Sequence, residues 1–462
     1  AASHPLANST VTAGHMVSFS AGNTPGALQW QVSSNNGSSW SNLTNDSTYS
    51  GTTSPTLLIT NASSSLSGLQ YRYVATSGGV VATSNAAMLS VAQAFFPFPT
   101  SIAVDASGNL YVSDSSSDVI QKITGAGQVS LIAGQTGAAG STDGTGVSAR
   151  FNMPAGIAIN SAGIIFVADT ANATIRRIGS DGAVTTFAGT ASIRGSADGT
   201  GTAATFSMPN GIAVDAAGNL YVADSMNDTI RKITATGAVT TFAGTAGLSG
   251  SANGNGATAR FNLPTGLAID GTGNVYVSDT TNNLIRKITA TGDVTTLAGL
   301  DGVSGSQDGT GGTAFFNHPN GLTIDSAGNL YVADTGNSVI RKITPAGTVT
   351  TIAGLAGIAG LLDGGGSDAF FNQPQALGID AGGNLYVADT GNAALRKINS
   401  TGTVTTLTLS AAPAPTPTPT PTPDPTPTPT PSSGGGGGGA FSDWFIGLLS
   451  LLCLARWPKK KE

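Results

Sequence analysis

Between residues 95 and 409, short apolar stretches and small polar turns alternate in a pattern that returns every 55 residues. In the third copy the apolar stretches are 211–215, 220–224, 229–234 and 239–244. Residues such as Gly, Asn, Ser and Thr separate them, which is typical of tight turns between strands. Each of the six copies is therefore predicted to be a four-stranded antiparallel meander. The period is marked by Pro99, Pro154, Pro209, Pro264, Pro319 and Pro374 and by Asp114, Asp169, Asp224, Asp279, Asp334 and Asp389.

Such a meander would be apolar on both faces. Ile230 and Ile233, three positions apart on one strand, point to opposite sides of the sheet. Each copy must therefore lie between other copies of itself. A closed radial stack meets this need, whereas an open solenoid leaves two apolar ends uncovered and has no capping repeats here. The predicted fold class is all-β, with a six-bladed β-propeller over residues 95–409.

The copies resemble NHL repeats, in a longer version that reads Pro-x-Gly-Ile-Ala-Val-Asp, Gly-Asn-Leu-Tyr-Val-Ala-Asp and Ile-Arg-Lys-Ile. The resemblance covers residues 95–409 and implies a six-bladed propeller. Related propellers serve as binding modules and as enzymes, so the fold alone does not choose between these functions.

Residues 1–92 form a separate predicted unit of short strands. Trp30 in Gln-Trp-Gln-Val, Trp40 and the stretch Gly68-Leu-Gln-Tyr-Arg-Tyr-Val resemble bacterial immunoglobulin-like domains. The resemblance implies a β-sandwich with one Trp between its sheets and a tyrosine corner, and Tyr73 stands where many such domains carry a cysteine. We expect a spacer rather than an adhesive domain.

In each copy, the turn between the second and third strands and the long link to the next copy are expected on one face. The links predict an acidic, Gly-rich rim there. The candidate binding residues are Asp143, Asp198, Asn253, Asp308 and Asp363, together with His318. Loop carboxylates suit calcium, but one carboxylate beside Gly is more typical of a turn, so no metal ligand and no catalytic residue are assigned.

The aspartates that end the second strands, Asp114, Asp169, Asp224, Asp279, Asp334 and Asp389, are interpreted as structural. Each is expected to hold its turn and to pair with the arginine seven residues later, as Asp169 with Arg176. The Arg-Lys pairs on the third strands, from Arg176-Arg177 to Arg396-Lys397, are expected to cover the sheets with their stems while their charges reach water.

The C-terminal region has a different composition. Residues 410–439 are a predicted linker in which every second residue from Pro413 to Pro431 is Pro, which gives a semi-rigid stalk of about 60 Å. Residues 440–462 combine a short apolar helix with Lys459, Lys460 and Lys461. They are predicted to be a membrane anchor or sorting signal, and they resemble those of Gram-negative surface proteins, although no Pro-Glu-Pro motif is present. This topology predicts an extracellular or outer-surface location.

Charge and composition exclude some partners. The net charge is −6, and 11 of the 19 Lys and Arg residues recur on the third strands, so nucleic acid is not an expected partner. The only cysteine is Cys453, so disulfides are not expected. We predict an exported, monomeric surface protein that binds a protein or carbohydrate at the loop-rich face and needs no cofactor. The alternative is an exported propeller enzyme of the lactonase or lyase type.

Overall fold

The computed structural model describes residues 4–13, 16–60, 62–92 and 94–413. Over these ranges the chain is β-structure with short 3₁₀ turns. None of the described residues forms a helix long and apolar enough to cross a membrane. The predicted stalk beyond residue 413 and the apolar helix at 440–462 lie outside the described ranges.

Residues 4–92 form two sheets around one core. The larger sheet contains β1 (Ser9–Thr12), β3 (Ala27–Ser33), β4 (Ser41–Asn42), β7 (Gln70–Ser77), β8 (Val80–Thr83) and β9 (Ala87–Ala92), and the smaller contains β2 (Val17–Ser20), β5 (Tyr49–Ser50) and β6 (Thr56–Ile59). A 3₁₀ turn, η1 (Ser64–Leu66), precedes β7. Trp30 is fully buried between the sheets, packs edge-on against Tyr73 and donates its indole N–H to the carbonyl of Ser54. The core therefore uses aromatic packing where a disulfide is absent.

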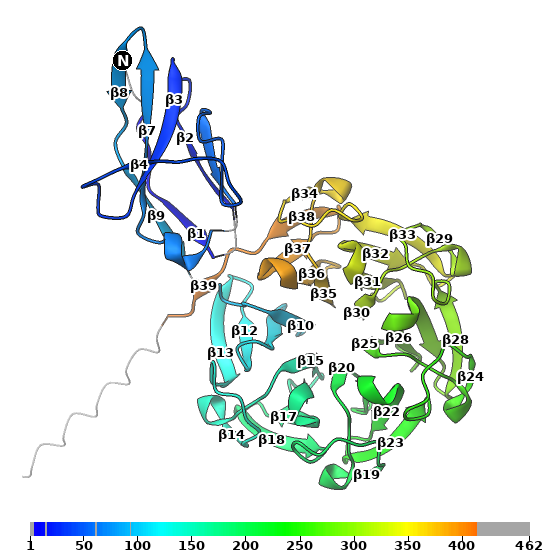
Figure 1. Cartoon of the computed structure of the whole chain (residues 1–462). Coiled ribbons are helices and arrows are strands. Elements are labelled where there is room, and N and C mark those ends of the chain that lie inside the picture. Colours follow the sequence, from blue (N-terminus) through cyan, green and yellow to red (C-terminus); the bar gives the residue numbers. More distant parts are fainter. Residues whose placement is uncertain (1–3, 14–15, 61, 93, 414–462) are drawn as a thin grey trace, which may run out of the picture. The chain divides into compact units, whose positions relative to one another are not determined.

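The repeats form six five-stranded sheets (Figure 1). In order along the chain they contain β10 (Pro99–Val104), β11 (Leu110–Asp114), β12 (Val119–Ile123), β13 (Gln128–Gly134) and β39 (Ser410–Ala411); β14 (Gly144–Thr145), β15 (Pro154–Ile159), β16 (Ile165–Asp169), β17 (Thr174–Ile178) and β18 (Ala183–Ala188); β19 (Gly199–Thr200), β20 (Pro209–Val214), β21 (Leu220–Asp224), β22 (Thr229–Ile233) and β23 (Ala238–Ala243); β24 (Gly254–Asn255), β25 (Pro264–Ile269), β26 (Val275–Asp279), β27 (Leu284–Ile288) and β28 (Asp293–Ala298); β29 (Gly309–Thr310), β30 (Pro319–Ile324), β31 (Leu330–Asp334), β32 (Val339–Ile343) and β33 (Thr348–Ala353); and β34 (Gly364–Gly365), β35 (Pro374–Ile379), β36 (Leu385–Asp389), β37 (Ala394–Ile398) and β38 (Thr403–Thr406).

Short 3₁₀ turns occupy two repeated places. The turns between second and third strands are η3 (Thr170–Asn172), η5 (Ser225–Asn227), η7 (Thr280–Asn282), η9 (Thr335–Asn337) and η11 (Thr390–Asn392); those in the links are η2 (Gly146–Ser148), η4 (Gly201–Ala203), η6 (Gly256–Thr258), η8 (Gly311–Thr313) and η10 (Gly366–Asp368). We call the face with these second-to-third turns the link face. First strands begin there, because Pro154 pairs with Asp169 at the end of β16.

The predicted four-stranded meander was incomplete, because each sheet has a fifth strand at its outer edge. In the second sheet the link before β15 contributes β14, whose Gly144 and Thr145 pair with Val184 and Ala183 of β18. This pairing covers part of an edge that would otherwise expose backbone N–H and C=O groups. In the first sheet the same place is taken by β39, which runs parallel to β13.

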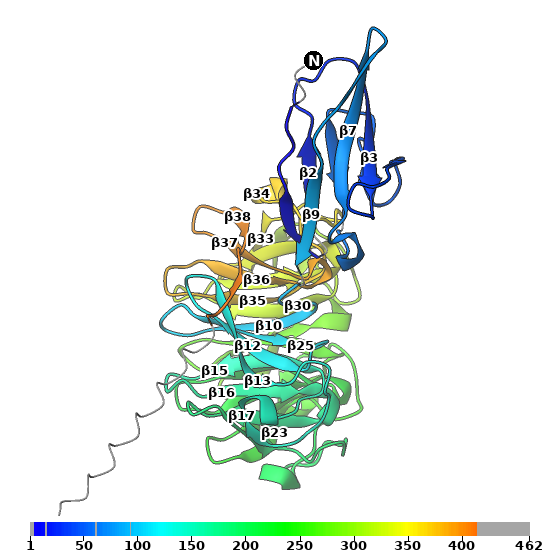
Figure 2. The same cartoon turned by 90° about the vertical axis from the view of Figure 1, so that its left-hand side faces the viewer.

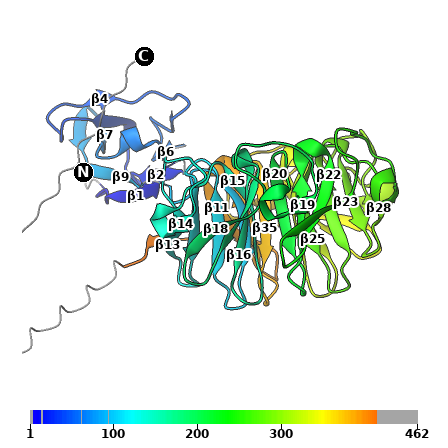
Figure 3. The same cartoon turned by 90° about the horizontal axis from the view of Figure 1, so that it is seen from below.

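The six sheets close into a ring. Each first strand packs against that of the next sheet, and β35 of the last sheet packs against β10 of the first. Thr390 Oγ1 donates to the carbonyl of Pro99 at 2.6 Å, as Thr280 Oγ1 does to Pro319 at 2.8 Å between two interior sheets. The seam between last and first sheets is therefore built like the others. The strands cross between the two faces of the ring, which is seen from the side in Figures 2 and 3.

The apolar cores lie between neighbouring sheets. One cluster combines Ile175 and Ala188 of the second sheet with Ile212 and Val222 of the third. Apolar side chains therefore project from both faces of each sheet, as the sequence predicts. Each repeat is stabilised by packing against its neighbours.

Candidate functional site

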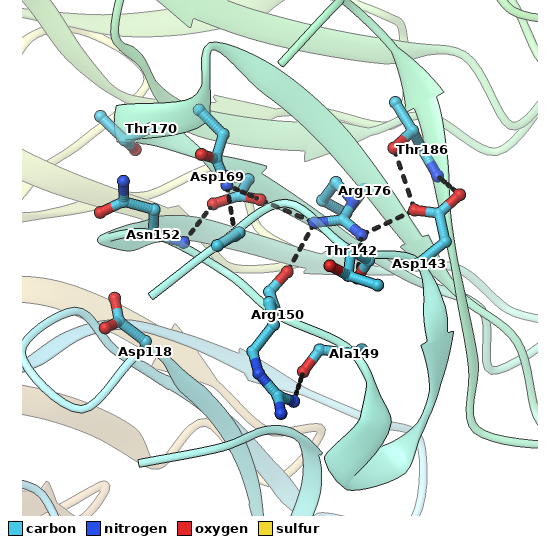
Figure 4. Close-up of polar contacts among 12 residues, drawn as sticks. Asp118, Thr142, Asp143, Ala149, Arg150, Asn152, Asp169, Thr170, Arg176 and Thr186 are labelled. Atoms are coloured by element: carbon cyan, nitrogen blue, oxygen red, sulfur yellow. Dashed lines mark hydrogen bonds and ion pairs between the residues drawn. The ribbon is translucent and has the colours of Figure 1, made fainter. Parts of the chain in front are cut away.

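A buried arginine joins two aspartates in the second sheet (Figure 4). Arg176 is fully buried; its Nη1 donates to Asp169 Oδ2 at 2.8 Å and its Nη2 to Asp143 Oδ1 at 2.7 Å. The same two nitrogens donate to the carbonyls of Arg150 at 2.8 Å and Thr142 at 3.1 Å. The arginine thus fastens the link before the sheet to the hairpin of its second and third strands. The predicted pair of Asp169 with Arg176 is present.

This arrangement, which we call the brace, recurs in five sheets. Its other copies are Arg231 with Asp224 and Asp198, Arg286 with Asp279 and Asn253, Arg341 with Asp334 and Asp308, and Arg396 with Asp389 and Asp363. In each sheet a phenylalanine ring lies under the guanidinium, as Phe206 does 5.2 Å from Arg231.

The first sheet departs from this pattern. Gln121 replaces the arginine, and its buried Oε1 has no hydrogen-bond partner among the described residues. Asp114 is buried and accepts instead from the backbone N–H groups of Phe98, Ser116 and Ser117. The hydroxyl of Ser116 also donates to Asp114 Oδ1, at 3.0 Å. The carboxylate of Asp114 therefore accepts from backbone N–H groups and one hydroxyl in place of the arginine.

The expectation that the third-strand arginines extend into water was wrong. Arg231 is buried because two carboxylates balance its charge and, together with two backbone carbonyls, accept hydrogen bonds from Nη1 and Nη2. Its buried Nε has no hydrogen-bond partner among the described residues. The neighbouring Lys232 follows the expectation better: it is partly exposed, and its ammonium lies 5.4 Å from the ring of Tyr221.

Burial has the largest effect on the pKa of the brace aspartates that end the second strands. It raises the pKa of Asp224 to about 6, and hydrogen bonds from Ser207 N–H and Asn227 with the charge of Arg231 offset it only in part. Asp169, Asp279, Asp334 and Asp389 have the same raised value, about 6, for the same reason. At Asp363 on the rim, burial acts in the same direction, but hydrogen bonds from Thr406 and Arg396 outweigh it and lower the pKa.

The predicted rim residues make hydrogen bonds within their own sheets. About half of the Asp143 side chain is exposed, yet its carboxylate accepts from Thr186 N–H at 3.2 Å and Thr186 Oγ1 at 3.0 Å, besides Arg176. Asn253 likewise accepts from Arg286 at 2.9 Å. The link residues and second-strand aspartates are thus brought together through the shared arginine. A separation of 33 residues from Asp143 to Arg176 gave no local sequence signal of this contact.

His318 lies apart from any acidic cluster. Its backbone has φ 49°, its N–H donates to Asn283 Oδ1, and its exposed ring contacts Asn317 Oδ1 through Nδ1 at 2.8 Å. Nowhere in the described ranges do three His, Cys, Asp or Glu residues gather as a metal-binding set.

The centre of the ring is constricted by backbone. Gly156, Gly211, Gly266 and Gly321 occupy equivalent places on neighbouring first strands. A Cβ at Gly211 would lie 2.0 Å from the carbonyl oxygen of Thr265, and one at Gly156 2.1 Å from that of Asn210. Only glycine lets these strands approach so closely. The remaining space is about 60 Å³, enough for a few water molecules rather than a metabolite.

Uncharged polar side chains surround the mouth of this constriction on the link face. They are Thr100, Asn210, Thr265, Asn320 and Gln375, each directly after the first-strand proline. The hydroxyls are used internally: Thr100 Oγ1 bonds to Ser115 and Thr265 Oγ1 to Thr280. The side-chain amides of Asn210, Asn320 and Gln375 make no hydrogen bond in the part of the chain that the structure describes, so they are available to a ligand. Sequence reasoning missed them because they vary within a repeat whose constant positions drew attention.

Comparison with known proteins identifies the repeats. The NHL repeat model matches residues 151–178, 206–233, 261–288 and 316–343. Each matched stretch contains a brace arginine and the phenylalanine beneath it.

Two curated proteins are similar to about two thirds of this chain. Protein SUPPRESSOR OF QUENCHING 1, chloroplastic, of Arabidopsis thaliana is 30% identical over 319 residues, which cover 65% of this chain and 30% of that protein. NHL repeat-containing protein 2 of Bos taurus is 30% identical over 339 residues, covering 65% of this chain and 46% of the relative. The chain thus spans less than half the length of these relatives.

Among solved structures, a structural genomics protein of unknown function from Bacteroides thetaiotaomicron shares the fold. The TM-score is 0.52 at 20% identity, with 85% of this chain and 98% of that chain covered. Together with the repeat matches, this likeness identifies the architecture: the chain carries NHL repeats and folds them into a β-propeller.

Proposed function

We propose that the chain is an exported cell-surface binding protein that displays a six-bladed NHL-type propeller, each sheet being one blade, on a Thr-Pro stalk. The immunoglobulin-like unit at residues 1–92 acts as a spacer, and residues 440–462 anchor the chain or direct its sorting. The alternating Pro residues from 413 to 431 and the basic end at Lys459–Lys461 support display and anchoring.

The observation that carries a binding role is the set of free amides at the channel mouth. Asn210, Asn320 and Gln375 each offer a donor and an acceptor, and Thr265 lies between the first two. They lie on one arc of the link face, over a constriction that no metabolite passes. A surface of this kind suits an uncharged polar ligand that rests on the mouth, such as a neutral carbohydrate or an extended polypeptide.

Binding is favoured over catalysis because the acidic groups nearby have structural partners. The aspartates at the ends of the second strands are fully buried against arginine. The rim carboxylates accept hydrogen bonds from threonines of their own sheets. General acid or base catalysis needs a carboxylate within reach of a substrate, and at the mouth the ligand-facing groups are amides.

The binding role is tested with the full chain on an array of neutral oligosaccharides and of uncharged peptides. We expect binding to one class, reduced at least tenfold by the double substitution Asn210→Ala/Asn320→Ala. Thr236→Ala is the matched control: it removes an exposed polar side chain from the turn between β22 and β23, on the opposite face. Equal loss in the control, or binding unaffected by the double substitution, would reject the mouth as the binding surface.

Export and anchoring are tested separately in a Gram-negative host that expresses the full gene. Protease added to intact cells should cleave the protein, and deletion of residues 440–462 should release it into the medium. A protein that stays protected in intact cells would contradict surface display without affecting the binding test.

A further inference from the structure

The first strands enclose a second hollow on the axis of the ring, on the face opposite the link face. Each first strand begins on the link face and ends on this opposite face, around the centre of the ring (Figure 1). The hollow, which we call the funnel, has a volume of about 230 Å³, against about 60 Å³ for the constriction behind it. The funnel is therefore large enough for an organic ligand that the constriction would not admit.

The side chains that line the funnel are aliphatic in all six sheets. An inner ring next to the constriction is nearly buried and comprises Ile102, Ile157, Ile212, Leu267, Leu322 and Leu377. An outer ring is partly exposed and comprises Val104, Ile159, Val214, Ile269, Ile324 and Ile379. The polar atoms of the wall belong mainly to the backbone, because each first strand is paired on one side only and leaves its inner edge free.

Directly after the outer ring, the first strands end in acidic turns. Five of the six turns begin with a carboxylate, the residues being Asp105, Asn160, Asp215, Asp270, Asp325 and Asp380. In the fifth sheet Asp325 accepts from the N–H groups of Ala327 and Asn329 at 2.9 and 2.8 Å. These contacts hold the carboxylate at the wide end of the funnel.

These carboxylates are charged at neutral pH. Burial raises the pKa of Asp325, but hydrogen bonds from Asn329 and Tyr331 outweigh it and lower the pKa. The pKa of Asp105 and of Asp380 is lowered in the same way, and that of Asp270 to about 2. The wide end of the funnel is therefore negatively charged.

Basic side chains lie further from the axis. They are on the third strands, two strands outward from the funnel, and comprise Lys122, Arg177, Lys232, Lys287, Lys342 and Lys397. Among the described residues they form no ion pair with the aspartates of the funnel. The ammonium of Lys232 instead lies 5.4 Å from the ring of Tyr221. A ligand on the axis thus lies closer to the negative charges than to the positive ones.

We propose that the funnel binds a small aliphatic amine, with its hydrocarbon chain against the two aliphatic rings and its ammonium group at the level of the aspartates. An apolar cavity of about 150 Å³ takes up benzene, so a space of 230 Å³ corresponds to a chain of about eight carbon atoms. The carboxylates keep their contacts within the turns and attract the ammonium through their field. Backbone carbonyls on the free inner edges accept its hydrogen bonds.

The size of the funnel favours a small molecule over a side chain of a partner protein. A leucine side chain has about half as many carbon atoms as the space accommodates, and it would leave the inner ring in contact with water. The funnel and the amides of the channel mouth lie on opposite faces, so this proposal does not depend on the proposed binding of a neutral polar ligand.

The test is calorimetric titration of the full chain with octylammonium chloride at pH 7 and low salt. We expect one molecule to bind per chain, at least tenfold more tightly than octanoate, which has the same length of chain and the opposite charge. Binding should weaken at least threefold in 200 mM salt, because exposed charges are screened. Methylammonium, which lacks the hydrocarbon chain, should bind at least tenfold more weakly than octylammonium.

A double substitution tests the carboxylates without disturbing their turns. Asp325→Asn/Asp380→Asn should weaken octylammonium binding at least threefold. Asparagine is compatible with this turn, because Asn160 of the second sheet accepts from the N–H groups of Ala162 and Ile164 at 3.0 Å each. The matched control, Asp181→Asn/Asp293→Asn, removes two exposed carboxylates from the outer part of the same face and should change the affinity less than twofold.

The aliphatic wall is tested by Ile269→Ser/Ile324→Ser, which should weaken binding at least fivefold in a chain that still melts cooperatively. Should this variant not fold, the aspartate variants decide the question. Octylammonium that does not bind, that binds no better than octanoate, or that is affected equally by the two pairs of aspartate substitutions would overturn the proposal. Binding of a cationic, leucine-rich peptide to the funnel in the absence of octylammonium binding would also overturn it, in favour of a protein partner.

Discussion

At the scale of single residues, the brace is the feature whose substitution should cost the most stability. Replacing Arg231 by Gln, the residue found in the first sheet at 121, leaves Asp224 buried without a cation. Breaking one partner from a buried pair costs about 3–5 kcal/mol, and urea unfolding of the variant should show a loss of that order. Lys232→Gln removes the adjacent, partly exposed cation and should cost less than about 1 kcal/mol. A brace variant as stable as the lysine variant would contradict this interpretation.

The two kinds of aspartate predict opposite pH effects. Asp224 has a folded pKa raised from 3.8 to about 6, so its contribution to stability is full below 3.8 and is lost as pH rises through 6. At Asp270, burial raises the pKa, but hydrogen bonds from Asn274 and Thr272 outweigh this and lower it to about 2, so its contribution is lost as pH falls from 3.8 through 2. Thermal unfolding from pH 2 to 8 should therefore show greatest stability near pH 4, with a decline towards pH 6 and another towards pH 2.

Single substitutions separate the two limbs of that curve. Asp224→Asn should reduce the decline between about pH 4 and 6, and Asp270→Asn should reduce the decline below about pH 4. A melting temperature that rises steadily from pH 4 to 8 would contradict the raised pKa of the buried aspartates.

At the scale of the strand, the glycines of the constriction set the distance between neighbouring sheets. A Cβ in Gly211→Ala would lie 2.0 Å from the backbone oxygen of Thr265, so the two first strands must separate. Such overpacking costs about 1–3 kcal/mol, measurable by urea unfolding. Gly271→Ala, in a turn where a Cβ meets nothing within 4 Å, should be neutral or slightly stabilising. Similar stability of the two variants would show that the strands adjust freely.

These elements also show what the sequence could predict. The four main strands of each repeat and their closure followed from apolar periodicity, because residues such as Ile230 and Ile233 need partners on both faces. The pair Asp169 with Arg176 followed from the spacing within one hairpin. The two-residue strand Gly144–Thr145 is too short to show alternation. The contact of Asp143 with Arg176 and the glycine constriction depend on distances across a link or between sheets, which local spacing does not encode.

At the scale of the whole molecule, the ring depends on the last few residues before the Thr-Pro segment. Leu407 donates its N–H to Leu395 at 2.9 Å, and Leu407 and Leu409 pack against the core shared by the last and first sheets, which includes Phe96 and Val112. A chain ending at residue 406 loses these leucines and β39, so the seam should open, bind a hydrophobic dye and melt at lower temperature. A chain ending at 413 keeps both and should melt close to the full chain. Because closure couples every sheet to its neighbours, a ring opened at one seam should expose the apolar faces of both sheets that meet there. If the 406 and 413 chains melted alike without dye binding, packing between the first strands alone would be sufficient to hold the ring closed.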